Sequence, residues 1–160
     1  ALQNVELPLT YRLMMRAYPW RRVSPTPWAP LRRPVTEARI AIVSSAGLYR
    51  AGIDRSFGTR EGEDVTVRWL PRDVATMRLT MGQTSDAFNR AAVESDQELA
   101  LPLTRLAELV TLGEVGSVAP HHVSFNGSML STGRFLRDSA PEVAQGLSVD
   151  QVDAALFVPV

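Results

Sequence analysis

Two serines directly follow an apolar run in the sequence VSSAG, residues 43–47. Hydroxyl and backbone N–H groups at such a strand end can bind an anion or a carboxylate, so Ser44 and Ser45 are candidate substrate-binding residues. The stretch has neither the G-x-G-x-x-G spacing nor the Walker pattern, which excludes a phosphate-binding loop of either kind. The same residues also fit an ordinary strand-to-helix turn in which a serine caps the helix.

A second polar cluster, APHHVSFNG, occupies residues 119–127. An imidazole can transfer protons near neutral pH, so we expect His122, or alternatively His121, to be a proton donor, with Ser124 lining the same substrate-binding loop. A histidine bonded to backbone carbonyls is the structural alternative. A serine hydrolase that uses Ser124 and His122 is disfavoured, because Ser124 does not lie in a G-x-S-x-G elbow.

Three charged residues between the second strand and the long helix are further candidates, namely Asp86, Asp96 and Arg105. An arginine on a mostly apolar helix usually pairs with a carboxylate. We therefore expect Arg105 either to bind a substrate carboxylate or to form a structural ion pair with Asp86 or Asp96.

The composition excludes several chemistries. All 17 basic residues are arginine, so these residues contain no Schiff-base lysine and no P-loop lysine. They contain no cysteine, and thus no thiol nucleophile, disulfide or thiolate metal site. His121 and His122 are neighbours, and neighbouring side chains on a strand point to opposite faces, so we expect no metal site.

The hydrophobic pattern predicts the elements that position these residues. Strands are expected at 38–47, 64–71, 117–127 and 153–160, and helices at 9–18, 84–95, 99–116 and 130–149, the last broken near Pro141. Strands that alternate with helices favour an α/β fold with a mostly parallel open sheet and flanking helices.

Ligands of open α/β sheets bind beyond the carboxyl ends of the strands. We therefore expect the loops after Val43, after Leu70, within 121–127 and after Val160 to face one site. The final stretch DAALFVPV, residues 153–160, is predicted to be a buried core strand without its crossover helix. We expect a sheet that is incomplete in this chain, completed by a second chain or by a missing C-terminal half, with Val160 as a cleavage or chain-end site.

The first residues differ in character from the rest, which predicts a basic, Pro/Trp-rich arm over 1–37 and a domain over 38–160. Within 1–34 a single acid, Glu6, accompanies six arginines: Arg12, Arg16, Arg21, Arg22, Arg32 and Arg33. Such an arm can bind nucleic acid or anionic lipid. Its prolines and tryptophans favour packing on an acidic surface of a partner subunit or of the domain itself, so we expect neither nucleic acid nor membrane as a partner.

The sequence also predicts a location in the cell. No apolar run approaches the ~20 residues that a membrane helix needs, and the N-terminus lacks the apolar core of a secretion signal. We therefore expect a cytoplasmic protein.

Several segments, in this order, resemble the glycine/betaine/sarcosine/D-proline reductase family, in particular its selenoprotein B-type subunit and short cysteine-containing relatives. The strongest are PLTRLAELVTLGEVGSVAP, residues 102–120, and SFNG, residues 124–127, within a resemblance that covers most of 26–160. The family shows a P-x-x-R-L helix, a turn ending in Gly and an S-F-x-G loop at these places.

The resemblance implies that a strand like DAALFVPV leads into a loop with a redox-active selenocysteine or cysteine, or that the precursor is cleaved there to give a pyruvoyl group. Because this chain has no cysteine, that group would be supplied from beyond Val160, on the continuing chain or a partner chain. The implied activity is reductive or covalent cleavage of a carbon–heteroatom bond in a small amine or amino-acid-like substrate, within a homo- or hetero-oligomer. The alternative is a non-catalytic assembly or binding subunit of a multi-chain complex.

Overall fold

A computed structural model of the protein describes residues 8–18, 23–58, 64–83, 85, 88–129 and 132–160. The chain divides into two compact units, residues 1–30 and residues 31–160. In the first unit, α1 (Leu9–Ala17) confirms the helix expected at 9–18. Two of the arginines expected in the arm, Arg21 and Arg22, lie outside the described residues.

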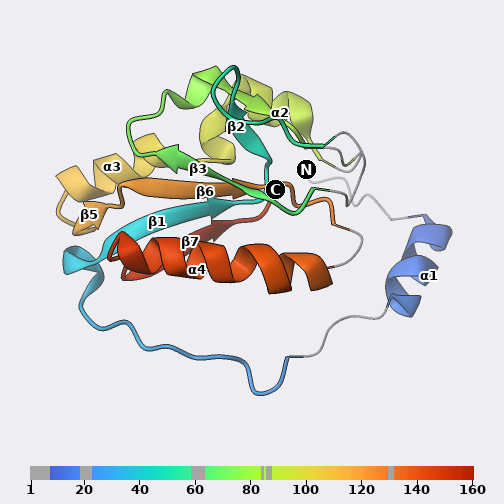
Figure 1. Ribbon diagram of the computed structural model, residues 1–160, viewed down its shortest axis with the longest axis horizontal. Coiled ribbons are helices and arrows are strands. Elements are labelled where there is room, and N and C mark those ends of the chain that lie inside the picture. Colours follow the sequence, from blue (N-terminus) through green and yellow to red (C-terminus); the bar gives the residue numbers. More distant parts are fainter. Residues whose placement is uncertain (1–7, 19–22, 59–63, 84, 86–87, 130–131) are drawn as a thin grey trace, which may run out of the picture. The chain divides into compact units, whose positions relative to one another are not determined.

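The second unit contains a mixed, mostly parallel sheet (Figure 1). Its strands are β1 (Arg39–Ser44), β3 (Val67–Pro71), β5 (Ser117–Val118), β6 (His121–Phe125) and β7 (Ala154–Val158). The strands β5 and β6 run parallel to β1 along one of its edges, and β7 runs parallel to it along the other. The expected α/β class is thereby confirmed.

The direction of β3 differs from what we expected. It pairs with β6 in the antiparallel sense, with Val67 opposite Phe125 and Leu70 opposite His122. The loop after Leu70 therefore lies at the amino edge of the parallel strands, and the prediction that it faces the same site as the other loops is wrong. Alternation of apolar residues reports which face of a sheet each side chain occupies, but not the direction in which the strand runs.

The last strand is less buried than its composition suggested. On β7, Leu156 is 46% and Phe157 is 69% exposed, and these neighbouring side chains point to opposite faces of the sheet. Within the described residues β7 pairs with β1 alone, so it is an edge strand there. The prediction of a buried core strand is therefore wrong as far as these residues show, because an apolar side chain is buried only where a neighbouring element covers it.

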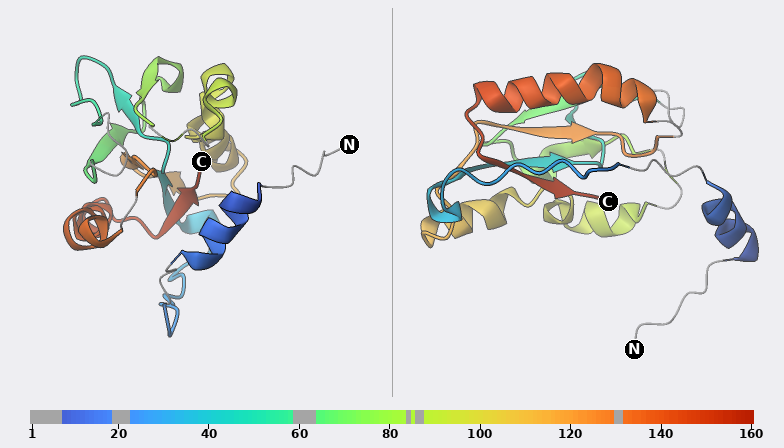
Figure 2. Two further views of the ribbon diagram at one scale, coloured as in Figure 1. Left: turned by 90° about the vertical axis from the view of Figure 1, so that its right-hand side faces the viewer. Right: turned by 90° about the horizontal axis from the view of Figure 1, so that it is seen from below.

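Helices cover both faces of the sheet (Figure 2). On one face lie α2 (Arg90–Ser95) and α3 (Leu103–Thr111), and on the other lies α4 (Ala140–Val149), preceded by a π-helical turn, η4 (Phe135–Ser139). The expected helix over 99–116 is shorter in the structure, because Pro102 lacks the N–H that a helix interior needs. Pro141 does not break the expected last helix, since the π-helical turn η4 continues directly into α4 and Pro141 lies just after their junction.

Short elements complete the fold. They comprise a two-stranded antiparallel sheet, β2 (Leu48–Arg50) with β4 (Leu79–Met81), and the 3-10 turns η1 (Val35–Glu37), η2 (Thr76–Arg78) and η3 (Gln97–Leu99). No helix among the described residues is long and apolar enough to span a bilayer.

Two hydrophobic clusters hold the layers together, one on each face of the sheet. The larger one joins Ile42 of β1 to Leu101 and Leu106 next to and within α3. The smaller one joins Val43 and Val123 to Trp69 and side chains of α4. Ile42 and Val43 are neighbours in sequence yet belong to different clusters, which is the alternation expected of a strand covered on both faces.

Candidate functional site

Ser45 joins the ends of two parallel strands at the carboxyl edge of the sheet. Its backbone N–H donates to the carbonyl of Val158 at the end of β7 (3.2 Å). Its Oγ accepts from the N–H of Val160 at 3.0 Å and lies 3.3 Å from the Val160 carbonyl, to which it can donate. The residue after β1 thus fixes the path of the chain that leaves β7.

The backbone carbonyl of Ser45 connects this point to two further loops. It accepts hydrogen bonds from the N–H of Gly127 (2.9 Å) and from Nε2 of Gln83 (3.1 Å). A Cβ on Gly127 would lie 2.8 Å from Cβ of Ser45, so only glycine permits this approach. The result is a hollow of about 200 Å³ lined by Gln83, Ser85, Phe88, Gly127, Ser128 and Val160. It is the place at the carboxyl edge where a ligand of an α/β sheet is expected.

Ser44 and Ser124 lie beneath this hollow and are fully buried. The Oγ of Ser44 accepts from the N–H of Ala46 (3.3 Å), and the Oγ of Ser124 accepts from the N–H of Leu48 (2.7 Å). Both hydroxyls therefore stabilise the turn after β1, and neither residue lines the hollow. Their contact with a substrate remains a prediction.

His122 is fully buried in the sheet. Its Nδ1 accepts a hydrogen bond from the backbone N–H of Ile42 (2.9 Å), between the stretches of β1 that pair with β5 and with β6. This bond fixes the neutral tautomer with the proton on Nε2, for which the described residues offer no hydrogen-bond partner. Burial, together with the proximity of His121, lowers the pKa of His122 to about 4 despite the opposing charge of Asp150. The imidazole thus replaces a backbone acceptor, and its proposed role as a proton donor remains a prediction.

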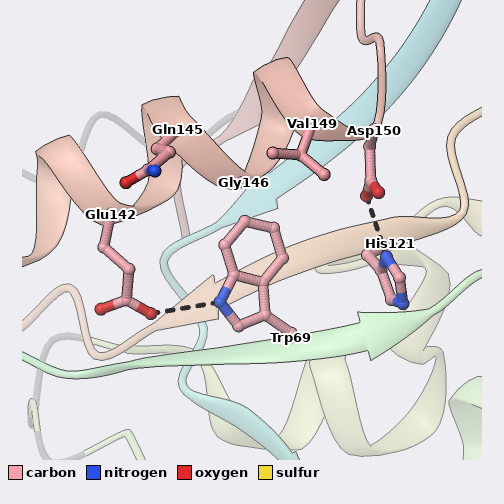
Figure 3. A pocket seen from close by; sticks show the side chains of 7 residues that line it. All are labelled: Trp69, His121, Glu142, Gln145, Gly146, Val149 and Asp150. Carbon is pink, nitrogen blue, oxygen red and sulfur yellow. Dashed lines mark hydrogen bonds and ion pairs between the residues drawn. The ribbon is translucent and has the colours of Figure 1, made fainter.

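His121 points to the other face of the sheet, toward α4 (Figure 3). Its Nδ1 lies 2.9 Å from Oδ2 of Asp150, and its ring meets that of Trp69 edge-on at 6.5 Å between centroids. The indole N–H of Trp69 donates to Glu142 (3.2 Å), and Gly146 leaves room for the indole, because a Cβ there would overlap the ring. These residues line an open groove of about 400 Å³ between α4 and β3.

The structure therefore separates residues that the sequence placed together. His121 stands at the start of β6 and Ser45 just beyond the end of the parallel neighbour β1, so they lie at opposite edges of the sheet. Arg105, exposed on α3, forms an ion pair with Glu108 (2.9 Å), while its pairing with Asp86 and its contact with a substrate carboxylate remain predictions. Asp96 accepts from the N–H of Glu98 as the cap of η3, and Asp86 lies outside the described residues.

The sequence reasoning missed Gln83, whose side chain links the β4 exit to Ser45. The only local signal is Gly82, where a Cβ would lie 2.8 Å from Cβ of Phe57 and where the backbone N–H donates to the carbonyl of Gly47. That glycine marks a close approach of two loops, but the sequence does not say which loops meet.

Comparison of the chain with known proteins finds a distant similarity to an enzyme subunit. The chain is 24% identical over 136 residues to the D-proline reductase subunit gamma of Acetoanaerobium sticklandii, an alignment that covers 84% of this chain and 54% of that protein. The chain thus spans about half the length of the curated relative it matches. No family model matches the chain, and no solved structure matches it. The similarity supports a distant relationship to reductase subunits and is not specific for the selenoprotein B-type subunit.

Proposed function

We propose that this chain is a subunit of a D-proline reductase-like enzyme. The observation that carries the proposal is the similarity to a D-proline reductase subunit along 84% of the chain. The hollow at the carboxyl edge, assembled by Ser45, Gln83 and Gly127, is consistent with it. The chain would contribute substrate-facing loops for cleavage of a carbon–heteroatom bond in a small amine or amino-acid-like substrate.

The redox-active group belongs, in this proposal, to the continuing chain or to a partner chain. Residues 1–160 contain no cysteine and no selenocysteine, so a thiol or selenol must come from elsewhere, and a pyruvoyl group would form at the start of a second chain. The group would lie at the hollow, a placement supported by the bonds of Ser45 to Val160 and by the polar residues Gln83 and Ser128 in the lining. The residues of this chain would orient the substrate and exclude water, and the supplied group would perform the covalent step.

The edge of β7 is the proposed contact for the second chain. Its outer backbone groups have no strand partner among the described residues, and Leu156 and Phe157 expose apolar surface on both faces of the sheet. A strand added there would bond to the backbone groups and cover both side chains. The occupant we propose is the chain that carries the redox-active group, since this would place that group beside Val160.

The test is an assay of the native complex isolated through this chain, with a dithiol as reductant and D-proline first among the substrates. Cleavage of the carbon–nitrogen bond takes up two electrons and two protons, while the dithiol becomes a disulfide. We expect substrate loss that depends on a copurified Cys-, Sec- or pyruvoyl-containing polypeptide, identified by intact mass of the denatured complex. Absence of any such polypeptide, continuing or separate, would refute the enzymatic proposal.

A pair of variants tests the docking edge itself. Phe157→Asp places a charge in the proposed strand contact and should release the second chain, while Ile53→Asp, at a similarly exposed apolar residue in a surface turn, should not. Equal retention of the second chain by both variants would argue against β7 as the contact.

The second candidate is a non-catalytic assembly subunit, which the exposed β7 edge also favours. A complex that forms through this edge, contains a stable second chain and turns over none of the small amines would support this alternative.

A further inference from the structure

Three arginines converge on a cavity at the amino edge of the sheet, opposite the Ser45 hollow. The cavity has a volume of about 430 Å³, and its lining includes Arg32, Arg33, Arg39, Ser117 and Ser148. They come from the segment before β1, from the starts of β1 and β5, and from the end of α4. A volume of this size suits a small molecule.

The charges around this cavity do not cancel. Nε of Arg33 lies 3.2 Å from Oδ1 of Asp153, which neutralises that carboxylate. Glu37 is the other acid in the lining, so two carboxylates face three guanidinium groups. One positive charge therefore remains in excess.

The three arginines differ in the hydrogen bonds and ion pairs that they already form. Arg39 is anchored, because its Nη1 donates to the carbonyl of Asp150 (2.8 Å) and reaches Oε1 of Gln151 (3.5 Å). The guanidinium of Arg32, in contrast, has no hydrogen bond or ion pair within the described part of the chain. It is the group most available to a ligand.

Two hydroxyl groups accompany the free guanidinium. The side chains of Ser117 and Ser148 line the cavity and make no hydrogen bond to other described residues. The nearby C-terminal end of α4 carries a partial negative charge that opposes an anion. Its exposed carbonyls are largely occupied, however, since Gly146, Leu147 and Ser148 accept backbone N–H groups of the following turn.

We propose that this cavity binds a small molecule through a phosphate group. A phosphate has three terminal oxygens and up to two negative charges, so it can accept from a guanidinium and from two hydroxyls at once. A planar guanidinium binds two of those oxygens side by side, which the compact ammonium of a lysine cannot do. The inference does not rest on the proposed reductase function, which concerns the opposite edge of the sheet.

The test is calorimetric titration of the intact protein with inorganic phosphate, with sodium chloride at matched ionic strength as the control. We expect saturable phosphate binding that is at least tenfold weaker in Arg32→Gln. Arg72→Gln, at an exposed arginine outside the cavity, should bind phosphate like the wild type. Chloride at the same ionic strength should not reduce phosphate binding by Arg32. Charge screening would weaken the attraction of phosphate to every exposed arginine alike, so it could not produce a difference between Arg32→Gln and Arg72→Gln.

A second variant tests the same site without changing its charge. Ser148→Ala removes one hydroxyl without changing charge, and we expect it to weaken phosphate binding severalfold. Both variants should melt like the wild type in the absence of phosphate, because neither side chain has a structural partner among the described residues. Wild-type affinity in both variants, equal weakening by Arg72→Gln, or no saturable binding at all would overturn the proposal.

Discussion

The two edges of the sheet use polar side chains in opposite ways. At the carboxyl edge, Ser44 and Ser124 are buried and their hydroxyls accept from backbone groups, and His122 does the same within the sheet. At the amino edge, His121 and Arg32 are exposed to solvent: His121 contacts Asp150, and Arg32 has no ion pair among the described residues. The polar groups of the first region hold the backbone in place, whereas those of the second region are exposed to solvent.

The adjacent histidines provide the sharpest test of this contrast. His122→Ala removes a fully buried ring and leaves the N–H of Ile42 without its acceptor, which should cost about 4 kcal/mol of unfolding free energy. His121→Ala, at a half-exposed side chain, should cost about 0.5 kcal/mol. Urea unfolding midpoints of the two variants measure the difference. Similar losses would mean that the contrast between buried and exposed polar side chains does not extend to stability.

The pH dependence of stability should follow His122. Its folded pKa of about 4 lies below the value of 6.5 of an unperturbed histidine, so the unfolded chain binds the proton more readily. The stabilisation is complete above pH 6.5 and is lost as the pH falls toward 4, by about 3 kcal/mol. Urea unfolding between pH 7 and pH 4 checks this, with His122→Gln as the control because it cannot titrate. An equal slope in both proteins would assign the effect to other groups.

Gly127 and Gly146 differ in what surrounds them, so their alanine variants should lose different amounts of stability. Gly127→Ala drives a Cβ into Ser45, including its backbone carbonyl, and should cost about 2 kcal/mol. Gly146→Ala meets the far end of the Trp69 side chain, which can turn aside, so the loss should be about 1 kcal/mol or less. Thermal unfolding compares the two variants, and indole fluorescence should change only in Gly146→Ala. A larger loss at Gly146 would show that the groove is as rigid as the carboxyl edge.

A small effect on stability is expected at Ser45. Ser45→Ala removes only its side-chain bonds to Val160, which are exposed, so unfolding free energy should fall by about 0.5–1 kcal/mol. Amide hydrogen exchange of Val160 should nevertheless accelerate, while that of Gly127, bonded to the Ser45 carbonyl, should not. Unchanged exchange at Val160 would show that the end of β7 is fixed by other contacts.

Much of the local structure was predictable because local patterns determine it. The apolar run ending in VSSAG predicted β1, and the helical spacing of Leu103 and Leu106 predicted α3. The placement of Ser45 and the loop containing Gly127 at one edge followed from the rule for parallel strands. These predictions need only the spacing of residues along the chain.

The sequence by itself determined the α/β class, the lack of a cysteine within residues 1–160 and most of the element positions. The tertiary structure alone decided that β3 runs antiparallel, that Phe157 is exposed and that His122 replaces a backbone acceptor for Ile42. It also decided that Arg32, Ser117 and Ser148 line one cavity. The physical reason is that composition and periodicity act within one element, whereas strand direction, burial and hydrogen-bond partners depend on residues distant in sequence.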